Sequence, residues 1–214
     1  NKRDVMGASV MHERKRPEFA TILAFDVKVT EEATRMANEL NVKVFTADII
    51  YHLFDQFTAY MAEIKAKKKA AAAEHVSFPC VLKIMPNCIF NKRDPIIVGV
   101  DIVKGIARIG TQLCIPSQGF IDIGKIAGME RDHKQVDKAT PGQSVAMKIQ
   151  PVSAAESSRL YGRHFDHKDE LVSRITRESI DMLKENFRDE LGKEDWRLVV
   201  ELKKKFENHY GEPM

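Results

Sequence analysis

The sequence is poor in cysteine, and its cysteines are not arranged for disulfide bonds or for metal binding. Only three occur among 214 residues, Cys80, Cys88 and Cys114, and no two of them form a CxxC pair. An odd number of isolated cysteines in apolar surroundings argues against a disulfide-stabilised or zinc-stabilised fold. We therefore expect a protein of a reducing compartment, and the cytoplasm is its predicted location.

Long apolar runs and a targeting segment are also missing. No stretch reaches the roughly 18 apolar residues that span a bilayer, and the first residues show no signal-peptide pattern, so no membrane association is expected. Because the chain starts at Asn1 in a charged stretch, we expect it to be a piece of a longer protein. The net charge is only +3, so any nucleic-acid contact would depend on local basic patches.

Recognisable catalytic motifs are absent. The segment Gly119–Ile126 matches the GxxxxGK part of a phosphate-binding loop, but Ile126 stands where Ser or Thr would bind Mg²⁺, and the segment alternates like a strand. His164, Asp166 and His167 could form a metal or acid-base cluster, but no further ligand follows at a suitable spacing. A polar loop with a helix N-cap at Asp166 is the favoured interpretation. We predict no catalytic residue, no metal site and no cofactor in this chain.

Residues 1–47 predict part of an α/β/α domain. Apolar residues alternate from Ala20 to Val29, as in a half-buried strand. Thr30 is a good N-cap for an amphipathic helix of about three turns, and a second short strand follows at Val42–Phe45. This β-α-β order indicates a parallel sheet. Two strands are too few for a stable sheet, so we expect the rest of the domain upstream of Asn1.

Residues 48–76 predict one long connecting helix. The segment contains no Gly or Pro, and its apolar stripe stops after Ile64. The run of lysines and alanines at 65–73 favours a helix but offers nothing to bury, which is typical of a semi-rigid helix that crosses solvent between domains. The lysine run is interpreted as a solvated helix face, with a phosphate-contacting patch as the alternative.

Residues 77–214 predict a β-barrel domain with a C-terminal helical extension. Up to about residue 152 the sequence consists of short β-rich runs separated by Pro, Gly and Asn, a pattern typical of a small antiparallel barrel. Residues 153–210 predict helices, with Gly192 ending one and Asp195 capping the last. The predicted fold class is therefore an α/β fragment with a partial parallel sheet, one long connecting α-helix, and a small antiparallel β-barrel with two C-terminal helices.

Two surfaces of this predicted fold could bind partners. Basic residues fall in barrel turns or at the junction of barrel and helices, where they can reach phosphates; they are Lys92, Arg93, Arg108, Arg131, Lys134 and Arg163. Singly each is ordinary surface, but as a set they make RNA contact credible. In the last helix Trp196 lies among cations, as in a groove for an acidic, apolar peptide. The alternative is that Trp196 packs this helix on its neighbour, and both can hold together.

Long segments of the chain closely resemble one family of translation factors. They are TILAFDVKVTEEATRMANELNVKVFTADIIYHLFDQFTAYM, FPCVLKIMPNCIFNKRDPIIVGVDIVKGIARIGTQLCIP, IGKIAGMERDHKQVDKATPGQSVAMK and YGRHFDHKDELVSRITRESIDMLKENFRDEL. These segments resemble the family of eukaryotic initiation factor 5B, the relative of bacterial initiation factor 2. The resemblance covers essentially the whole chain and implies part of the third domain, the connecting helix and the fourth domain of that family.

The resemblance implies a function for the whole factor and partners for this part of it. The family consists of GTPases that join the ribosomal subunits, but their G domain, with its GTP and Mg²⁺, has no counterpart here, so GTP hydrolysis is not expected of this chain. The fourth domain is expected to hold the acceptor end of initiator methionyl-tRNA and to bind the C-terminal tail of initiation factor 1A. The ribosome, mainly its large subunit, is a further expected partner, and we expect a monomer.

Residues for these two contacts are hypotheses. For the tRNA they are Lys92, Arg93, Arg131 and Arg163, and for the factor 1A tail they are Leu183, Phe187, Trp196, Leu202, Lys203 and Phe206. Two function classes stay open at this point. One is an RNA-binding and protein-binding module of a translation GTPase; the other is a peptide-docking adaptor domain with no RNA contact. Steep salt dependence would distinguish phosphate contacts from apolar docking.

Overall fold

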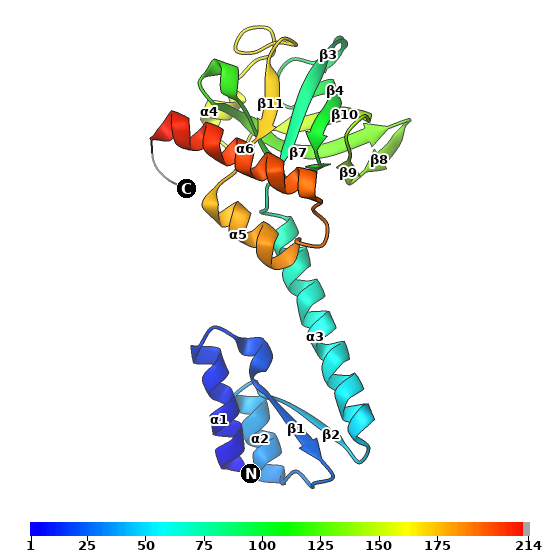
Figure 1. The fold of residues 1–214 in the computed structure, drawn as a ribbon, viewed down its shortest axis with the longest axis vertical. Coiled ribbons are helices and arrows are strands. Elements are labelled where there is room, and N and C mark those ends of the chain that lie inside the picture. The colour runs from blue at the N-terminus through cyan, green and yellow to red at the C-terminus, as the bar shows by residue number, and fades with distance from the viewer. Residues whose placement is uncertain (212–214) are drawn as a thin grey trace. The chain divides into compact units, whose positions relative to one another are not determined.

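The computed structural model describes residues 1–211, and the last three residues of the predicted barrel domain, 212–214, lie outside the described residues. The chain divides into two compact units, the first from Asn1 to Lys68 and the second from Lys69 onward. The division falls inside one helix, α3, which runs continuously from Ile50 to Ala73. Figure 1 shows the order of the elements.

The first unit is a two-stranded parallel sheet covered by two helices. Its elements are α1 (Lys2–Glu13), a 3-10 turn (Pro17–Phe19), β1 (Thr21–Phe25), α2 (Glu31–Glu39), β2 (Lys43–Ala47) and the greater part of α3. Strands β1 and β2 pair in parallel, as the β-α-β order predicts. Thr30 caps α2 by accepting a hydrogen bond from the Ala33 N–H at 3.3 Å. The predicted helix start is therefore confirmed.

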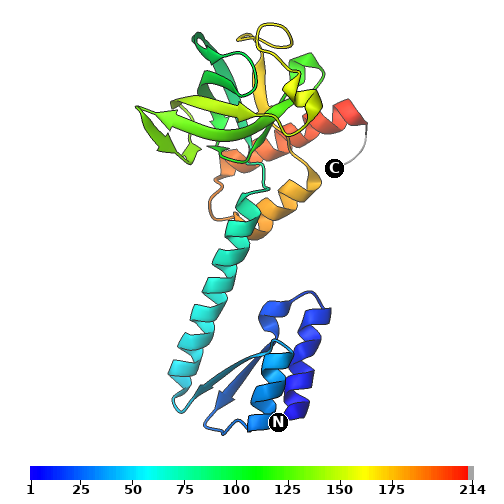
Figure 2. The ribbon, with the colours of Figure 1, turned by 180° about the vertical axis from the view of Figure 1, so that it is seen from behind.

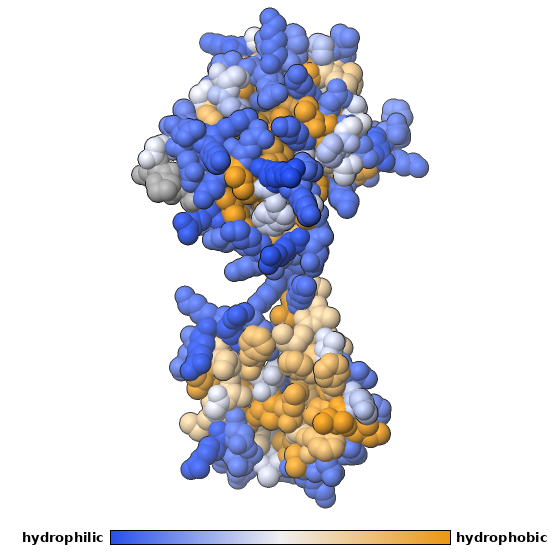
Figure 3. Space-filling model, in the orientation of Figure 1, coloured by the Kyte–Doolittle hydropathy of each residue, from blue (hydrophilic) through white to orange (hydrophobic). Residues whose placement is uncertain are grey.

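Two different surfaces of this unit carry apolar residues. Inside it, a small core forms around Val5, Ala33, Ala37 and Val42. Outside, apolar side chains that are about half exposed or more gather over β1, β2 and the start of α3 (Figure 3); they are Leu23, Phe25, Val27, Ile49, Ile50, Tyr51 and Phe54. A two-stranded sheet buries little surface by itself, which explains why so much apolar area stays accessible within the described residues.

The second unit is built on a closed β-barrel. Its strands are β3 (Cys80–Asn91), β4 (Ile96–Gly105), β5 (Ala107–Arg108), β6 (Gln112–Ile115), β7 (Ile121–Arg131), β8 (Lys134–Val136), β9 (Lys138–Ala139), β10 (Ser144–Gln150) and β11 (Glu170–Ser173). The helices are a 3-10 turn (Pro116–Gln118), α4 (Ala154–Ser157), α5 (Arg177–Asn186) and α6 (Lys193–Tyr210). All barrel pairings are antiparallel, in the order β10-β4-β3-β11-β6-β7, and β7 returns to β10. The predicted fold class is confirmed.

Strand β11 departs from the sequence-based expectation. It lies at Glu170–Ser173, in the segment 153–210 that the pattern predicts as helical, and it pairs with β3 and β6 to close the barrel. Asp166 caps no helix; its carboxylate accepts a hydrogen bond from the Lys168 N–H at 2.7 Å in the turn before the strand. Two long helices do follow, and they lie side by side against the barrel in both views (Figures 1 and 2).

Two cores result because both faces of several strands are covered. Successive side chains of a strand point to opposite faces, so Leu82 and Leu171 fill the barrel, whereas their neighbours Val81 and Val172 face α5 and α6. The outer core also contains Phe78, Cys114, Ile175, Leu183, Phe187, Leu198, Leu202 and Phe206. The helices are thus an integral layer of this domain.

The end of α3 belongs to this second core. Ala72 and Ala73 pack against it, and Lys69 pairs with Glu190, which also accepts a hydrogen bond from Arg108 at 2.9 Å. One residue earlier, Lys68 pairs with Glu18 of the first unit at 3.0 Å. Lys65, Lys67 and Lys68 are exposed, as the solvated-face interpretation expects, and Lys68 and Lys69 in addition pair with carboxylates. The expectation that this part of the helix buries nothing is wrong at Ala72 and Ala73.

Among the helices of residues 1–211, none is both long and apolar enough to cross a membrane.

Candidate functional site

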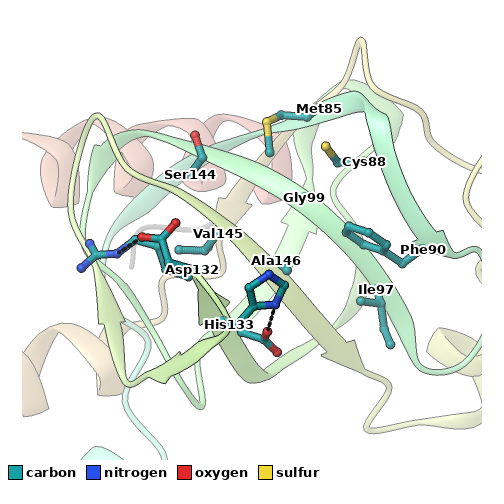
Figure 4. A pocket seen from close by; sticks show the side chains of 12 residues that line it. Met85, Cys88, Phe90, Ile97, Gly99, Asp132, His133, Ser144, Val145 and Ala146 are labelled. Carbon is teal, nitrogen blue, oxygen red and sulfur yellow. Dashed lines mark ion pairs between the residues drawn. The ribbon is translucent and has the colours of Figure 1, made fainter.

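The candidate site is a pocket on the barrel with a volume of about 490 Å³. One side is formed by apolar residues of β3, among them Met85, Cys88 and Phe90, and the floor by residues of β4 and β10 such as Gly99 and Ala146 (Figure 4). Phe90 is 66% exposed, so its ring is available at the mouth of the pocket. Gly99 is needed here because a Cβ at this position would lie 2.5 Å from the Cys88 Cβ. The pocket suits a flexible apolar group.

A charged hairpin turn borders the other side of the pocket. Strands β7 and β8 are joined by Asp132 and His133, whose φ angles of 52° and 61° are those of a tight two-residue turn with matching twist. Arg131 lies 3.9 Å from the Asp132 carboxylate, and His133 lies 3.7 Å from that of Glu130 (Figure 4). The side chain of Arg131 is 43% exposed. This turn therefore presents a cation beside an apolar pocket.

The remaining residues predicted for the tRNA contact, Lys92, Arg93 and Arg163, lie in two neighbouring loops. Lys92 and Arg93 are exposed in the β3–β4 turn, where the Arg93 N–H donates to the Asn91 side-chain oxygen at 3.3 Å. Arg163 is exposed in the loop before β11. The Tyr161 N–H of that loop donates to the Lys92 carbonyl at 3.2 Å, so the two loops are joined. Lys92 comes two residues after Phe90, which lines the pocket, so the β3–β4 turn follows the pocket wall directly along the chain.

Most residues predicted for the peptide partner are in the core. Leu183, Phe187, Leu202 and Phe206 are at most 2% exposed and hold α5 and α6 on the barrel. Trp196 is partly buried against the same core, and Lys203 is partly exposed, 3.5 Å from the Glu207 carboxylate. In this structure the four buried side chains support the helical layer, and Trp196 and Lys203 are the members of the set that reach the surface.

The segments considered for catalysis take other roles. Gly119–Ile126 leads into β7 and has no helix after it, so it does not fit a nucleotide-binding loop. His164 accepts a hydrogen bond from the Leu160 N–H at 3.0 Å through Nδ1. Within the part of the chain that the structure describes, no three metal-binding side chains come together. Burial raises the pKa of the Cys80 thiol to about 12 and also raises that of Cys114, so both are poor nucleophiles.

Sequence reasoning names Arg131 as a turn cation but misses the pocket beside it. Met85, Cys88, Phe90 and His133 are single residues of strands and a turn, without a motif, and only closure of the barrel brings them together. The one available signal was Phe90, an aromatic residue at the end of a strand just before Lys92 and Arg93.

Comparison with known proteins assigns this barrel to a class. The family model described as elongation factor Tu domain 4 matches residues 78–172, which run from just before β3 into β11. The model described as translation-initiation factor 2 matches residues 1–58 in the first unit. The chain is therefore built from domains of translational GTPases.

The similarity to curated proteins is closer. The chain is 51% identical over 207 residues to eukaryotic translation initiation factor 5B of Rattus norvegicus, covering 97% of this chain and 17% of that protein. It is 40% identical to the Saccharomyces cerevisiae factor, covering 94% and 21%. It is 30% identical to a probable translation initiation factor IF-2 of Staphylothermus marinus, covering 99% and 34%.

A solved structure agrees with these relatives. The crystal structure of GDP-bound aIF5B from Aeropyrum pernix has 25% identity and a TM-score of 0.56, covering 99% of this chain and 34% of that one. The chain belongs to the eukaryotic translation initiation factor 5B family and corresponds to the C-terminal part of such factors, not to their G domain. It spans about a sixth to a third of the length of the relatives compared here.

Proposed function

We propose that this chain is the C-terminal binding module of a translation initiation GTPase that promotes joining of the ribosomal subunits in the cytoplasm. In this role the barrel holds the acceptor end of initiator methionyl-tRNA, and the helical layer docks the C-terminal tail of initiation factor 1A. GTP hydrolysis and its Mg²⁺ belong to a G domain, which the matched part of the family does not include. Membership of the family supports a role in initiation.

The pocket on the barrel is the observation that carries the tRNA part of the proposal. A methionyl group is flexible and apolar, and Met85, Cys88 and Phe90 offer a surface of the same kind. The ester links this group to a phosphate-rich strand, and Arg131, Lys92 and Arg93 lie at the border of the pocket or close to it along the chain. In this arrangement the cations bind the phosphates of the tRNA acceptor strand whatever its sequence, and the pocket recognises the methionyl group.

Binding of methionyl-tRNA and deacylated initiator tRNA to the chain tests this division of roles. Arg131→Ala is expected to weaken both and to reduce the slope of log affinity against log salt by roughly one, because one phosphate contact is lost. Phe90→Ala is expected to weaken methionyl-tRNA alone, since it alters only the exposed wall of the pocket. Lys148→Ala, an exposed lysine of β10, is the control and should change neither.

Either of two results would refute the proposal. One is equal affinity of the unmodified chain for methionyl-tRNA and deacylated tRNA, which would leave the pocket without a role. The other is an unchanged salt slope in Arg131→Ala.

Docking of the factor 1A tail is the second part of the proposal. Trp196 and Lys203 combine an aromatic surface and a cation on α6, which suits an acidic peptide with apolar side chains. Trp196 is the single tryptophan of the chain, so its fluorescence reports the titration directly. Saturable changes with the tail peptide that weaken in Lys203→Ala are expected, and no change at millimolar peptide would exclude this surface.

A further inference from the structure

A second groove lies between the barrel and α6, with a volume of about 580 Å³. Its residues come from β3, the loop before β7, the segment leading into β11 and the end of α6. They are Lys83, Pro116, Ser117, Phe120, Lys168, Glu170, Lys205 and Asn208. None of the residues predicted from the sequence for tRNA or for the peptide lines this groove, so it is distinct from both proposed sites.

The charge of the groove is predominantly positive. Lys83 and Lys168 are exposed, and within residues 1–211 neither forms an ion pair. Lys205 is 3.4 Å from Glu201, so its charge is partly shared. Within residues 1–211, Glu170 is the one carboxylate that lines the groove, and it stands opposite Lys83 in the pairing of β11 with β3. Three cations against one anion favour a polyanionic ligand.

An aromatic cluster lies at the α6 end of the groove. Phe120 packs against Phe206 at 5.0 Å and against the His209 ring at 4.5 Å with an interplanar angle of 32°. Tyr210 lies edge-on to His209 at 4.8 Å and is 51% exposed. Aromatic surfaces of this kind are where unpaired bases stack in proteins that bind single strands.

The backbone holds Phe120 in place at an energetic cost. Gly119 and Phe120 have φ angles of 73° and 56°, and a bulky side chain in this region is uncommon. Such conformations persist where surrounding structure fixes them, often at binding sites. Here the packing of Phe120 on Phe206, which is only 2% exposed, offsets the strain and keeps the ring at the groove.

We propose that this groove is a second RNA-binding site, in which Lys83 and Lys168 contact phosphates of a single-stranded segment and a base stacks on the cluster of Phe120, His209 and Tyr210. The combination of a cationic groove with exposed rings favours RNA over an acidic peptide, which would use the cations but not a stacking surface. Because no amino acid is recognised here, an RNA without an aminoacyl group is a sufficient ligand.

The lysines are tested with a fluorescein-labelled oligouridine of about ten nucleotides, within the usual length of such sites. In the 214-residue chain, Lys83→Ala with Lys168→Ala is expected to lower affinity about tenfold and to reduce the salt slope by about 0.7 for each lysine. The control pair, Lys148→Ala with Lys184→Ala, removes the same charge from exposed sites on β10 and α5. An equal loss in the control pair would overturn the proposal.

Two further variants change the groove without removing lysines. Glu170→Gln is expected to raise affinity severalfold, because it removes a carboxylate that lines the groove, whereas Glu185→Gln on α5 should not. His209→Ala with Tyr210→Ala is expected to lower affinity about fivefold or more through lost stacking. Both residues are exposed but also contact Phe120, so thermal unfolding is measured in parallel to show that the variant is folded at the assay temperature. Unchanged affinity in both sets would refute RNA binding here.

The same assay separates this site from the methionyl pocket. Oligouridine binding should persist in Arg131→Ala, and methionyl-dependent tRNA discrimination should persist in Lys83→Ala with Lys168→Ala. If oligouridine does not bind but an Asp-rich peptide binds and is lost with the two lysines, the groove is a peptide site and the proposal fails. That result would leave the function of the pocket untouched.

Discussion

Glu190 joins three segments that are distant in the sequence. Its carboxylate pairs with Lys69 at the end of α3 and with Arg108 of β5. The Arg108 guanidinium in turn lies over the Phe78 and Phe187 rings at 4.8 and 5.3 Å. Burial opposes ionisation of Glu190, but the hydrogen bonds and charges of Lys69 and Arg108 outweigh it and lower the pKa of the carboxyl. The ionised carboxylate is thus part of the folded structure.

Neutralising this carboxylate should destabilise the second unit. Glu190→Gln is expected to lower the free energy of unfolding by about 1 kcal/mol at neutral pH, a modest value because the side chain is about one-third exposed and partly screened. Since the folded pKa is lower than the ordinary value of 4.5, the stabilisation is complete above that value and is lost as the pH falls below it through the folded pKa. Urea unfolding at several pH values measures this.

Glu194→Gln provides the control for this prediction. Glu194 also pairs with an arginine, Arg197, at 2.7 Å, but its side chain is 83% exposed. No measurable change is expected there. A difference between Glu190→Gln and the unmodified chain that does not shrink as the pH falls through the acid range would contradict the electrostatic explanation.

At the scale of elements, the sequence predicts helices with strong local signals and misses a strand without one. Thr30 and the apolar stripe of α2 act within a few residues, so the helix start can be read directly. Strand β11 has only four residues, and Leu171, Val172 and Ser173 are all buried because the strand is covered on both faces. The alternation of apolar and polar residues that marks a half-buried strand is therefore missing from β11. Together with the apolar residues that follow it, the segment instead shows the spacing of a helix. Only pairing with β3 and β6 decides its structure.

The ends of the C-terminal helices are predicted less well than the helices themselves. Gly192 is expected to end a helix, but it is the N-cap of α6, and its N–H donates to the Asp195 carboxylate at 2.8 Å. Asp195, which the sequence predicts as the N-cap of the last helix, is instead its third residue, and α6 begins at Lys193. The helix itself is found, but its start and the role of the glycine are wrong. The candidate site follows this rule too: Arg131 is visible as a turn cation, whereas the pocket depends on barrel closure.

The meeting of β3, β4 and α6 depends on the absence of a side chain at Gly105. A Cβ there would overlap the Pro79 carbonyl oxygen and lie 2.7 Å from Leu198 of α6, and the φ angle is +75°. Gly105→Ala is therefore expected to lower the free energy of unfolding by about 2–4 kcal/mol. Gly142→Ala, with a φ angle of +84° and open space around it, should cost only about 1 kcal/mol.

Urea unfolding of the two variants separates crowding from backbone strain. Both carry a positive φ angle, so the difference between them measures the contact with Pro79 and Leu198. Equal losses in the two variants would mean that α6 adapts to the added methyl group and that this junction is less tightly packed than the structure indicates.

At the scale of the whole molecule, α3 is one helix shared by two units. Its first turns pack in the first unit, where Phe45 contacts Phe57 and Tyr60 at ring distances of 6.4 and 5.2 Å. Its last turn packs in the second unit, through Ala72 and Ala73. The division between the units falls between Lys68 and Lys69, which pair with carboxylates of different units. Each unit therefore fixes its own end of the helix.

Under the proposed function, the stiffness of this helix couples movement of the rest of the factor to the tRNA-binding barrel. Two glycines inserted between Lys68 and Lys69 of the full-length factor leave the contacts within each unit intact. Each glycine disfavours the helical conformation by about 1 kcal/mol relative to alanine, so the helix bends more easily at this point. We expect slower subunit joining, measured by light scattering, with methionyl-tRNA binding unchanged.

Two alanines at the same place are the matched control, because they change length and rotation equally and keep the helix stiff. The glycine insertion should be slower than the alanine insertion, since only stiffness differs between them. Equal rates would show that α3 acts as a tether of fixed length, and the coupling through a stiff helix would be abandoned.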